Sequence, residues 1–183
     1  RGLLVLQARS EGPVPLLMVE CSSEREVRAI ARYDAEQVQP GDGLNQLMPD
    51  GTLMLTVDPR QGQRYQGIVA LEGDSVAAML EHYMLRSEQL DTRLLLASNG
   101  EHAAGMLLQR LPDGHGDADG WPRVQALAET VSAEELLTTP ADTLLYRLFH
   151  QESVQCFEPA SLNFACTCSR ERVAGMLQMM GAE

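Results

Sequence analysis

The amino-acid sequence predicts an α+β fold, in which an antiparallel, β-rich domain with one long packed helix precedes a helical region. Three observations support this class. Residues 1–112 are dominated by short apolar runs separated by Gly, Pro and Asp, a pattern typical of strands joined by turns. Residues 74–90 carry apolar side chains at helical spacing. Residues 122–150 contain helical patterns alone, which indicates a helical linker region at 113–155 and a separate start of a small domain at 156–183.

Five strands are expected in the first part of the chain. They are residues 1–8, 14–21, 27–33, 52–58 and 64–71. A loop rich in Gly, Asp and Pro occupies residues 38–51. In 52–58, Leu53, Leu55 and Val57 alternate with Thr and Met, so they should share the buried face of a strand. The last two strands should pair as a hairpin inside an antiparallel sheet.

The long helix is expected over residues 74–90, where Asp74 or Ser75 can cap its first turn. Its apolar stripe consists of Val76, Met79, Leu80 and Tyr83. A second strand pair, 92–98 and 103–111, follows around the turn dipeptide Asn99–Gly100.

Residues 112–120 contain His115 and three Asp residues, but their spacing fits neither a calcium loop nor a zinc motif, so we interpret them as a solvated linker. Helices should follow at 121–131, at 132–137 and at 139–150. Ser132 and Glu135 have the spacing of a capping box, and Thr139 is the expected cap of the third helix.

The C-terminal part is expected to contain two short extended pieces, 153–159 and 162–168, and a last helix over 169–180. The apolar face of this helix would be formed by Val173, Met176, Leu177 and Met180. The chain begins inside a strand pattern and ends soon after a helical one, so we expect it to be part of a longer protein.

The composition excludes several classes of protein. Hydrophobic residues make up 44% of the 183 residues, which favours a folded globule over disorder. The net charge of -12 and the pI near 4.7 disfavour nucleic acid as the main partner. Apolar runs are well short of the roughly 18 residues that a membrane span needs. Four cysteines are too few for a secreted disulfide scaffold of this length, which favours a reducing cytosol.

The candidate site is the C-x-C pair Cys166 and Cys168, which immediately precedes the last helix. A bend at Thr167 would let both sulfurs reach one zinc ion, as in a zinc knuckle. The helix N-terminus and the guanidinium groups of Arg170 and Arg172 would favour the thiolate form, which assists metal binding and oxidation alike.

Two thiols do not complete a four-coordinate zinc site, and the rest of the sequence offers no convincing partner. Cys156 lies at an unfamiliar spacing, and Cys21 is better explained as a small buried side chain. The four His residues are isolated. If zinc is bound, its other two ligands should lie beyond Glu183. The C-x-C pair could equally serve a thiol–disulfide oxidoreductase, or be incidental. No catalytic residue can be assigned, because the sequence lacks a recognisable nucleophile, phosphate-binding or redox-enzyme motif.

Two stretches resemble the 33 kDa heat shock protein family of redox-regulated bacterial chaperones. They are residues 62–94 (GQRYQGIVALEGDSVAAMLEHYMLRSEQLDTRL) and residues 164–173 (FACTCSRERV). Residues 103–112 and 128–152 are also similar, and the likeness extends from about Leu3 to the end.

The resemblance implies a cytoplasmic, dimeric chaperone that is not an enzyme and that holds unfolding client proteins under oxidative stress. In the family, a C-x-C pair and a later C-x-x-C pair bind one zinc ion when reduced. Oxidation forms disulfides, releases the metal, unfolds the C-terminal part and exposes apolar surface. Of these ligands and redox-active residues, Cys166 and Cys168 are present here, and the C-x-x-C pair would lie beyond Glu183.

The same resemblance makes residues 122–150 the natural element to lose its structure with the switch. Its apolar positions are Leu127, Val131, Leu136, Leu144 and Leu148. We expect these side chains, or the sheet surface that they cover, to bind clients. A third possibility is a constitutive zinc-bound interaction module, whose activity would ignore oxidants.

Overall fold

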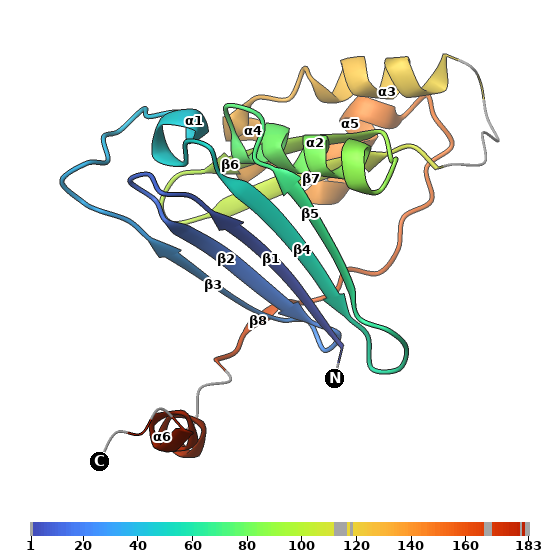
Figure 1. Cartoon of the computed structure of the whole chain (residues 1–183). Helices are drawn as coiled ribbons and strands as arrows, with labels where there is room; N and C mark the ends of the chain where they lie inside the picture. Colours follow the sequence, from blue (N-terminus) through green and yellow to red (C-terminus); the bar gives the residue numbers. More distant parts are fainter. Residues whose placement is uncertain (1, 112–116, 118, 167–169, 180, 182–183) are drawn as a thin grey trace.

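The α+β class is confirmed by a computed structural model that describes residues 2–111, 117, 119–166, 170–179 and 181. Within these residues the main sheet has the strand order β5-β4-β1-β2-β3-β8 (Figure 1). Its strands are β1 (Leu3–Arg9), β2 (Leu16–Ser22), β3 (Glu26–Arg32), β4 (Thr52–Asp58), β5 (Tyr65–Ala70) and β8 (Asn163–Phe164). Neighbours are antiparallel except β3 and β8, which run parallel. The predicted first five strands are therefore all present, and a sixth comes from the C-terminal part.

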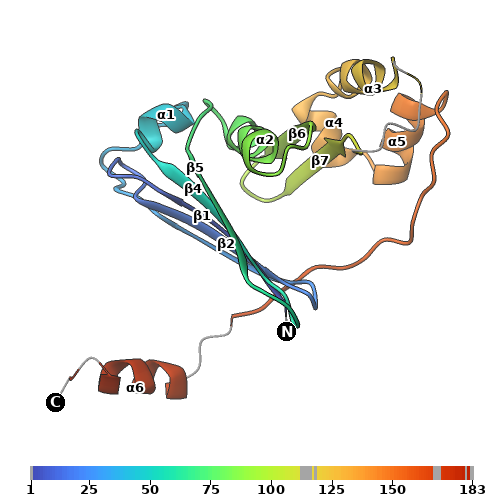
Figure 2. The same ribbon diagram turned by 45° about the vertical axis from the view of Figure 1, so that its right-hand side comes forward.

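The core lies on one face of this sheet, beneath α1 (Leu44–Leu47) and α2 (Val76–Ser87) (Figure 2). Ala8 of β1 and Leu53 of β4 are fully buried partners in the register. The other buried members of this cluster are Leu44, Met48, Leu71, Met79 and Tyr83. The predicted stripe of α2 is thus buried at its centre, whereas its first member, Val76, is 39% exposed.

The predicted inside–outside alternation of 52–58 is only partly right. Leu53 is buried, but Val57 on the same face is exposed, and Thr56 on the other face is buried. The helices cover the end of the sheet near Leu53 and stop short of Val57. Thr56 is covered by Gln66, whose side-chain amide donates to the Thr56 hydroxyl at 3.0 Å.

The expected loop at 38–51 contains the short helix α1, which sequence patterns missed. Four residues are too few to show a helical period, and Gly and Pro flank them. The Gln46 side chain accepts a hydrogen bond from the Gly43 N–H at 2.9 Å and so closes the first turn.

A hydroxyl cluster joins the end of α2 to β5. Ser75 caps the start of this helix, as predicted, by accepting from Ala78 N. At the other end, Glu88 accepts hydrogen bonds from Tyr65 at 2.9 Å and from Tyr83 at 3.0 Å. Burial raises the pKa of Tyr83 to about 12, because the phenolate would lose its hydration. Gly67 of β5 lies directly under the Tyr83 hydroxyl, where a side chain would not fit.

The predicted hairpin around Asn99–Gly100 forms a separate two-stranded sheet of β6 (Thr92–Ser98) and β7 (Ala103–Gln109). Gly100 has φ of 90°, which favours glycine in this turn. Three helices follow: α3 (Gly120–Ala128), α4 (Ala133–Thr138) and α5 (Ala141–Phe149). The α4 helix packs on both strands of the hairpin, and α3 packs on α5.

The Ser132–Glu135 capping box of α4 is confirmed, because each side chain bonds the backbone N–H of the other. The expected cap at Thr139 is wrong. Thr139 ends α4, its N–H donating to Glu135 O at 2.9 Å, and Pro140 occupies the N-cap position of α5 without a side-chain cap. Five apolar residues of the helical region were expected to bind clients. Of these, Leu144 is buried, and the other four are half-buried: Leu127, Val131, Leu136 and Leu148.

The C-terminal part leaves α5, returns to the main sheet and then leads to α6 (Arg170–Met179) (Figure 1). Of the two predicted extended pieces, 153–159 contains neither helix nor strand, and 162–168 contains the two-residue strand β8, with residues 167–168 outside the described part. Val173 and Leu177 of α6 are about half exposed, and Met180 lies outside the described residues. No helix in the part of the chain that the structure describes has the length and apolar character needed to cross a membrane.

Candidate functional site

Cys166 lies beside the edge of the main sheet, two residues beyond β8. The N–H of Asn163 donates to Arg25 O at 3.0 Å, and the N–H of Ala165 donates to Val27 O at 3.2 Å. These bonds hold the chain on β3 until the residue before the thiol. The Cys166 residue is exposed, as is typical of a cysteine that reacts with oxidants. Cys168 and His115 lie outside the described residues.

Cys21 and Cys156, the other cysteines that the structure describes, do not form a metal-binding group with Cys166. Cys156 is exposed in the extended stretch, and Cys21 is half-buried in β2, with its thiol 3.7 Å from Ser22 O. Among the described residues, no group of three or more His, Cys, Asp or Glu side chains is placed to hold a metal ion.

The donor chemistry at the C-x-C pair nevertheless suits zinc. Thiolate sulfur is a preferred zinc ligand, and exposure leaves the Cys166 sulfur accessible to an ion and to an oxidant. The helix α6 begins at Arg170, one residue after the predicted start, and a helix N-terminus favours the thiolate form of a cysteine close to it. The described part of the chain therefore supplies one sulfur of the predicted site. The zinc site stays a prediction.

An open apolar surface, which sequence patterns did not reveal, covers the end of the main sheet that carries β8. The register aligns one apolar row across all six strands: Tyr65, Val57, Leu4, Cys21, Val27 and Phe164. Among the described helices, only the end of α2 reaches this end of the strands, where the Tyr65 hydroxyl lies 3.2 Å from Ser87 Oγ (Figure 2). Leu4 is 42% exposed, Tyr65 is 44% exposed and Phe164 is 79% exposed. We call this set of six residues the open row.

Ion pairs hold the helical region 120–152 together on its surface. Arg123 of α3 donates to both carboxylate oxygens of Glu152, at 2.6 and 3.1 Å, and to Asp117 at 2.8 Å. Arg93 of β6 lies 3.2 Å from Glu81 of α2 and 2.9 Å from Glu129, which ends α3. Ion pairs thus connect parts of the helical region to one another and connect this region to the β-rich part.

These pairs shift the pKa values of their members. The hydrogen bond from Arg123 lowers the pKa of Glu152. The backbone N–H of Asp119, and then Arg123, lower the pKa of Asp117. The backbone N–H of Ser132, its hydroxyl and Arg147 lower the pKa of Glu135. A carboxylate with a lowered folded-state pKa stabilises the fold above its ordinary pKa, and this contribution is lost as pH falls through the folded-state value.

We therefore expect acid to loosen α3–α5 before it affects the main sheet. The ordinary values are 4.5 for Glu152 and 3.8 for Asp117, so the change should begin below about pH 4. Trp121, the single tryptophan of the chain and the second residue of α3, should shift its emission to the red over this range. The Glu152→Gln variant should show a smaller shift. Unchanged emission down to pH 3 would contradict the expectation.

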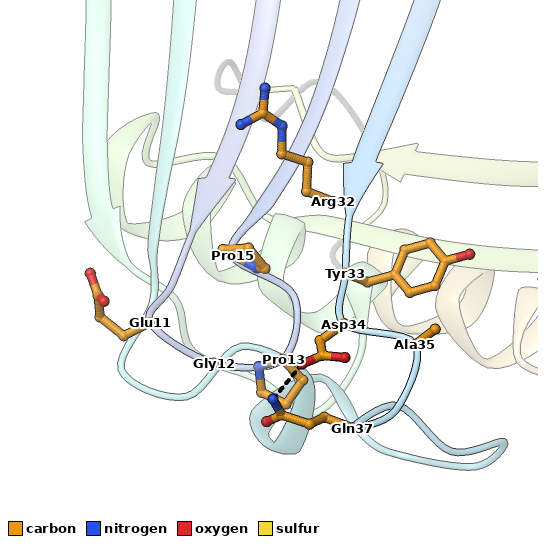
Figure 3. A pocket seen from close by; sticks show the side chains of 9 residues that line it. All are labelled: Glu11, Gly12, Pro13, Pro15, Arg32, Tyr33, Asp34, Ala35 and Gln37. Carbon is orange, nitrogen blue, oxygen red and sulfur yellow. Dashed lines mark hydrogen bonds between the residues drawn. The ribbon is translucent and has the colours of Figure 1, made fainter.

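A surface hollow of about 570 Å³ opens beside the β1–β2 turn (Figure 3). Its lining mixes the carboxylates of Glu11 and Asp34 with Arg32 and the rings of Pro13 and Tyr33. Asp34 accepts a hydrogen bond from Gln37 at 2.6 Å, whereas the side chains of Arg32 and Tyr33 point away from it. The hollow carries both acidic and basic side chains, and these side chains do not point toward a common position. Its chemistry therefore indicates no class of ligand, and we assign no site there.

The fold and the thiol segment define an α+β protein whose cysteine-bearing C-terminal segment is attached to the edge of its main sheet. The family model described as Hsp33 protein matches residues 1–183. The chain therefore belongs to the Hsp33 protein family, which confirms the resemblance seen in the sequence.

Sequence identity to 33 kDa chaperonins supports this family membership. The 33 kDa chaperonin of Azotobacter vinelandii is 60% identical over 98% of the chain, and that of Pseudomonas aeruginosa is 55% identical over 98%. The 33 kDa chaperonin of Chromobacterium violaceum is 55% identical over the whole chain. The chain spans 62% of the length of each of these relatives.

A solved structure supports the fold. The crystal structure of the 33 kDa chaperonin, a heat shock protein 33 homolog, from Thermotoga maritima has a TM-score of 0.81. The match covers 98% of this chain and 65% of that one at 19% identity, and it shows the common fold.

Proposed function

We propose that the protein is a redox-regulated chaperone, a holdase that binds unfolding client proteins under oxidative stress. One observation carries this proposal: the exposed thiol segment is attached to the sheet at the same end as the open row. Phe164 belongs to the row and lies two residues before Cys166. Chemistry at the thiols can therefore change the exposure of an apolar surface of the kind that marks a protein-binding site.

The thiols of Cys166 and Cys168 would hold half of a zinc site in the reduced protein, with the other two ligands beyond Glu183. The ion would supply folding free energy to the C-terminal segment, which buries little apolar surface of its own. Residues 153–164 are all exposed, so packing contributes little to their order.

Peroxide would remove this support by oxidising thiols to disulfides. Each disulfide takes two electrons and two protons from a pair of thiols, and one hydrogen peroxide is reduced to two waters. A sulfur in a disulfide no longer binds the ion as a thiolate. The segment that begins at β8 would then leave the sheet, and the ion-paired helices 120–152 would lose their attachment at that end.

The expected partners are unfolded or partly folded client proteins and a second copy of the chain in a homodimer. The acidic net charge of -12 argues against nucleic acid as a partner, and neither a membrane nor an enzymatic substrate is expected. The cytoplasm is the compartment in which reduced thiols and zinc would persist before stress.

The proposal predicts oxidant-dependent protection in the full-length protein. Peroxide with mild heat should suppress aggregation of a thermally unfolding reporter and increase bis-ANS fluorescence, and both changes should disappear in the Cys166→Ser/Cys168→Ser variant. Cys156→Ser is the matched control and should respond like the wild type, because Cys156 is not a predicted ligand. Protection that is equal before and after peroxide would refute redox control and favour a constitutive module.

An insulin-reduction assay separates this function from a thiol–disulfide oxidoreductase. The holdase should show no catalytic turnover, whereas an oxidoreductase would turn over through the C-x-C pair. Turnover that the double serine variant abolishes would contradict the proposal.

A further inference from the structure

We propose that the outer edge of β3 is a strand-acceptor site, which β8 fills in the resting protein and an extended client segment fills when β8 leaves. The inference deepens the proposed function, and it rests on that function for the identity of the client. Its site is a row of backbone groups, which the alternation of hydrogen bonds in the sheet identifies.

In β3, every second residue directs its backbone N–H and C=O groups away from β2, toward the outer edge of the sheet. β8 bonds the carbonyl oxygens of Arg25 and Val27, so the odd-numbered residues face away from β2. In an antiparallel ladder the even-numbered residues then form the hydrogen-bonded pairs with β2. Ala29 and Ala31 continue the outward series past the end of β8. Among the described residues no strand pairs with Ala29 and Ala31 on the side away from β2, and both are exposed.

The edge carries few of the devices that usually block strand addition. Its outward residues, Ala29 and Ala31, are small, and the strand contains no proline or bulge. Two arginines lie on the opposite face of β3. Arg28 is paired with Glu20, whereas Arg32 forms no ion pair within the described part of the chain. A bound segment with neutral or acidic residues on that face would therefore fit best.

β8 shows which chemistry the edge accepts. It is held by backbone bonds, and its Phe164 side chain extends the open row while remaining 79% exposed. The edge of β3 would thus recognise a bound segment mainly through backbone hydrogen bonds. Apolar side chains would be preferred at alternate positions of that segment. An extended, partly unfolded polypeptide with this alternation is the class of partner that fits.

The resident strand is weak enough to be displaced. Two N–H groups of the C-terminal segment bond β3, and a typical backbone hydrogen bond contributes about 1 kcal/mol net. A longer segment would use the outward N–H and C=O groups of Ala29 and Ala31 as well. It would therefore outcompete β8 once the C-terminal segment has lost its other support.

The test uses the full-length protein with Ala165→Pro in the presence of a zinc chelator. The substitution removes one donor to β3, and the chelator removes the other support of the C-terminal segment, so the edge should be free without an oxidant. The probe is a fluorescent peptide with the sequence of residues 161–169 and serine in place of both cysteines, because continuing the β8 register places its positions 166–168 beside Ala29 and Ala31. It should bind Ala165→Pro and slow amide exchange at Ala29 and Ala31. Adding Ala29→Pro, which leaves the β2 pairs intact, should weaken binding by about fivefold, since one backbone bond is lost.

Ile68→Pro is the matched control, because Ile68 faces outward on the opposite edge at β5 and is 63% exposed. It should leave binding unchanged. The same peptide with N-methyl groups at the positions of Asn163 and Ala165 should bind about tenfold more weakly, and this comparison needs no change to the sheet.

Equal binding of the two peptides, or equal effects of Ala29→Pro and Ile68→Pro, would overturn the inference. Those results would leave oxidant-dependent protection, and hence the proposed function, intact. Conversely, loss of aggregation suppression in the oxidised wild type, with the peptide results as expected, would refute the chaperone assignment and retain the acceptor edge.

Discussion

Gly67→Ala is expected to lower the free energy of unfolding by about 3 kcal/mol, because the new methyl group has no room. It would overlap the hydroxyl oxygen of Tyr83 and lie 2.6 Å from Ser87 Oγ. Tyr83 is 1% exposed and lies in the core, so its ring has nowhere to move without displacing α2 from β5. Urea unfolding followed by circular dichroism measures the change.

Two further variants test this explanation. For Gly175→Ala in α6, the added carbon meets no atom of another described segment within 4 Å, so this substitution should be neutral or slightly stabilising. Combining Gly67→Ala with Tyr83→Phe removes the overlapping hydroxyl and should recover part of the loss. Strictly additive effects of the two substitutions would show that the steric contact is not the cause.

The proposed zinc site leads us to expect that a chelator added to the reduced full-length protein will open the C-terminal segment while the main sheet stays folded. Structural zinc contributes on the order of 10 kcal/mol to small zinc modules, far more than the roughly 2 kcal/mol from two backbone bonds to β3. In amide exchange after chelation, Asn163 and Ala165 should lose protection, whereas β1 and β4 at the centre of the sheet should keep it.

The cysteine variants provide the controls for this experiment. Cys166→Ser should show the open pattern without a chelator, and Cys156→Ser should behave like the reduced wild type. The expectation is wrong if chelation leaves the Ala165 amide protected, or if β1 and β4 exchange together with it.

Much of the fold could be predicted because local patterns specify it. The strand over 52–58 has the predicted bounds, and Ser75 and the Ser132–Glu135 pair cap their helices as expected. Alternation also identified which residues of 52–58 face the core side. The alternation could not indicate how much of the sheet the helices cover, because that depends on where α2 ends. Val57 lies beyond the covered part of the core face and is therefore exposed.

The candidate site was only half predictable. The C-x-C spacing singled out Cys166, but a two-residue strand such as β8 has no period that a sequence could show. Its parallel pairing with β3 joins segments that are distant in the chain, so no local signal reports it. The open row depends on the register of six strands and emerges only once all are aligned.

The extended stretch 153–162 acts as a tether between α5 and β8. When β8 comes off, these ten residues keep the start of the detached strand within about 35 Å of Glu152, which Arg123 holds beside α3. A flexible connection of this length gives an effective concentration in the millimolar range. Rebinding of β8 to the edge of β3 is therefore a first-order process that needs no second molecule. A bound client segment always competes with β8 for this edge. We expect the client to be released once β8 can pair with β3 again.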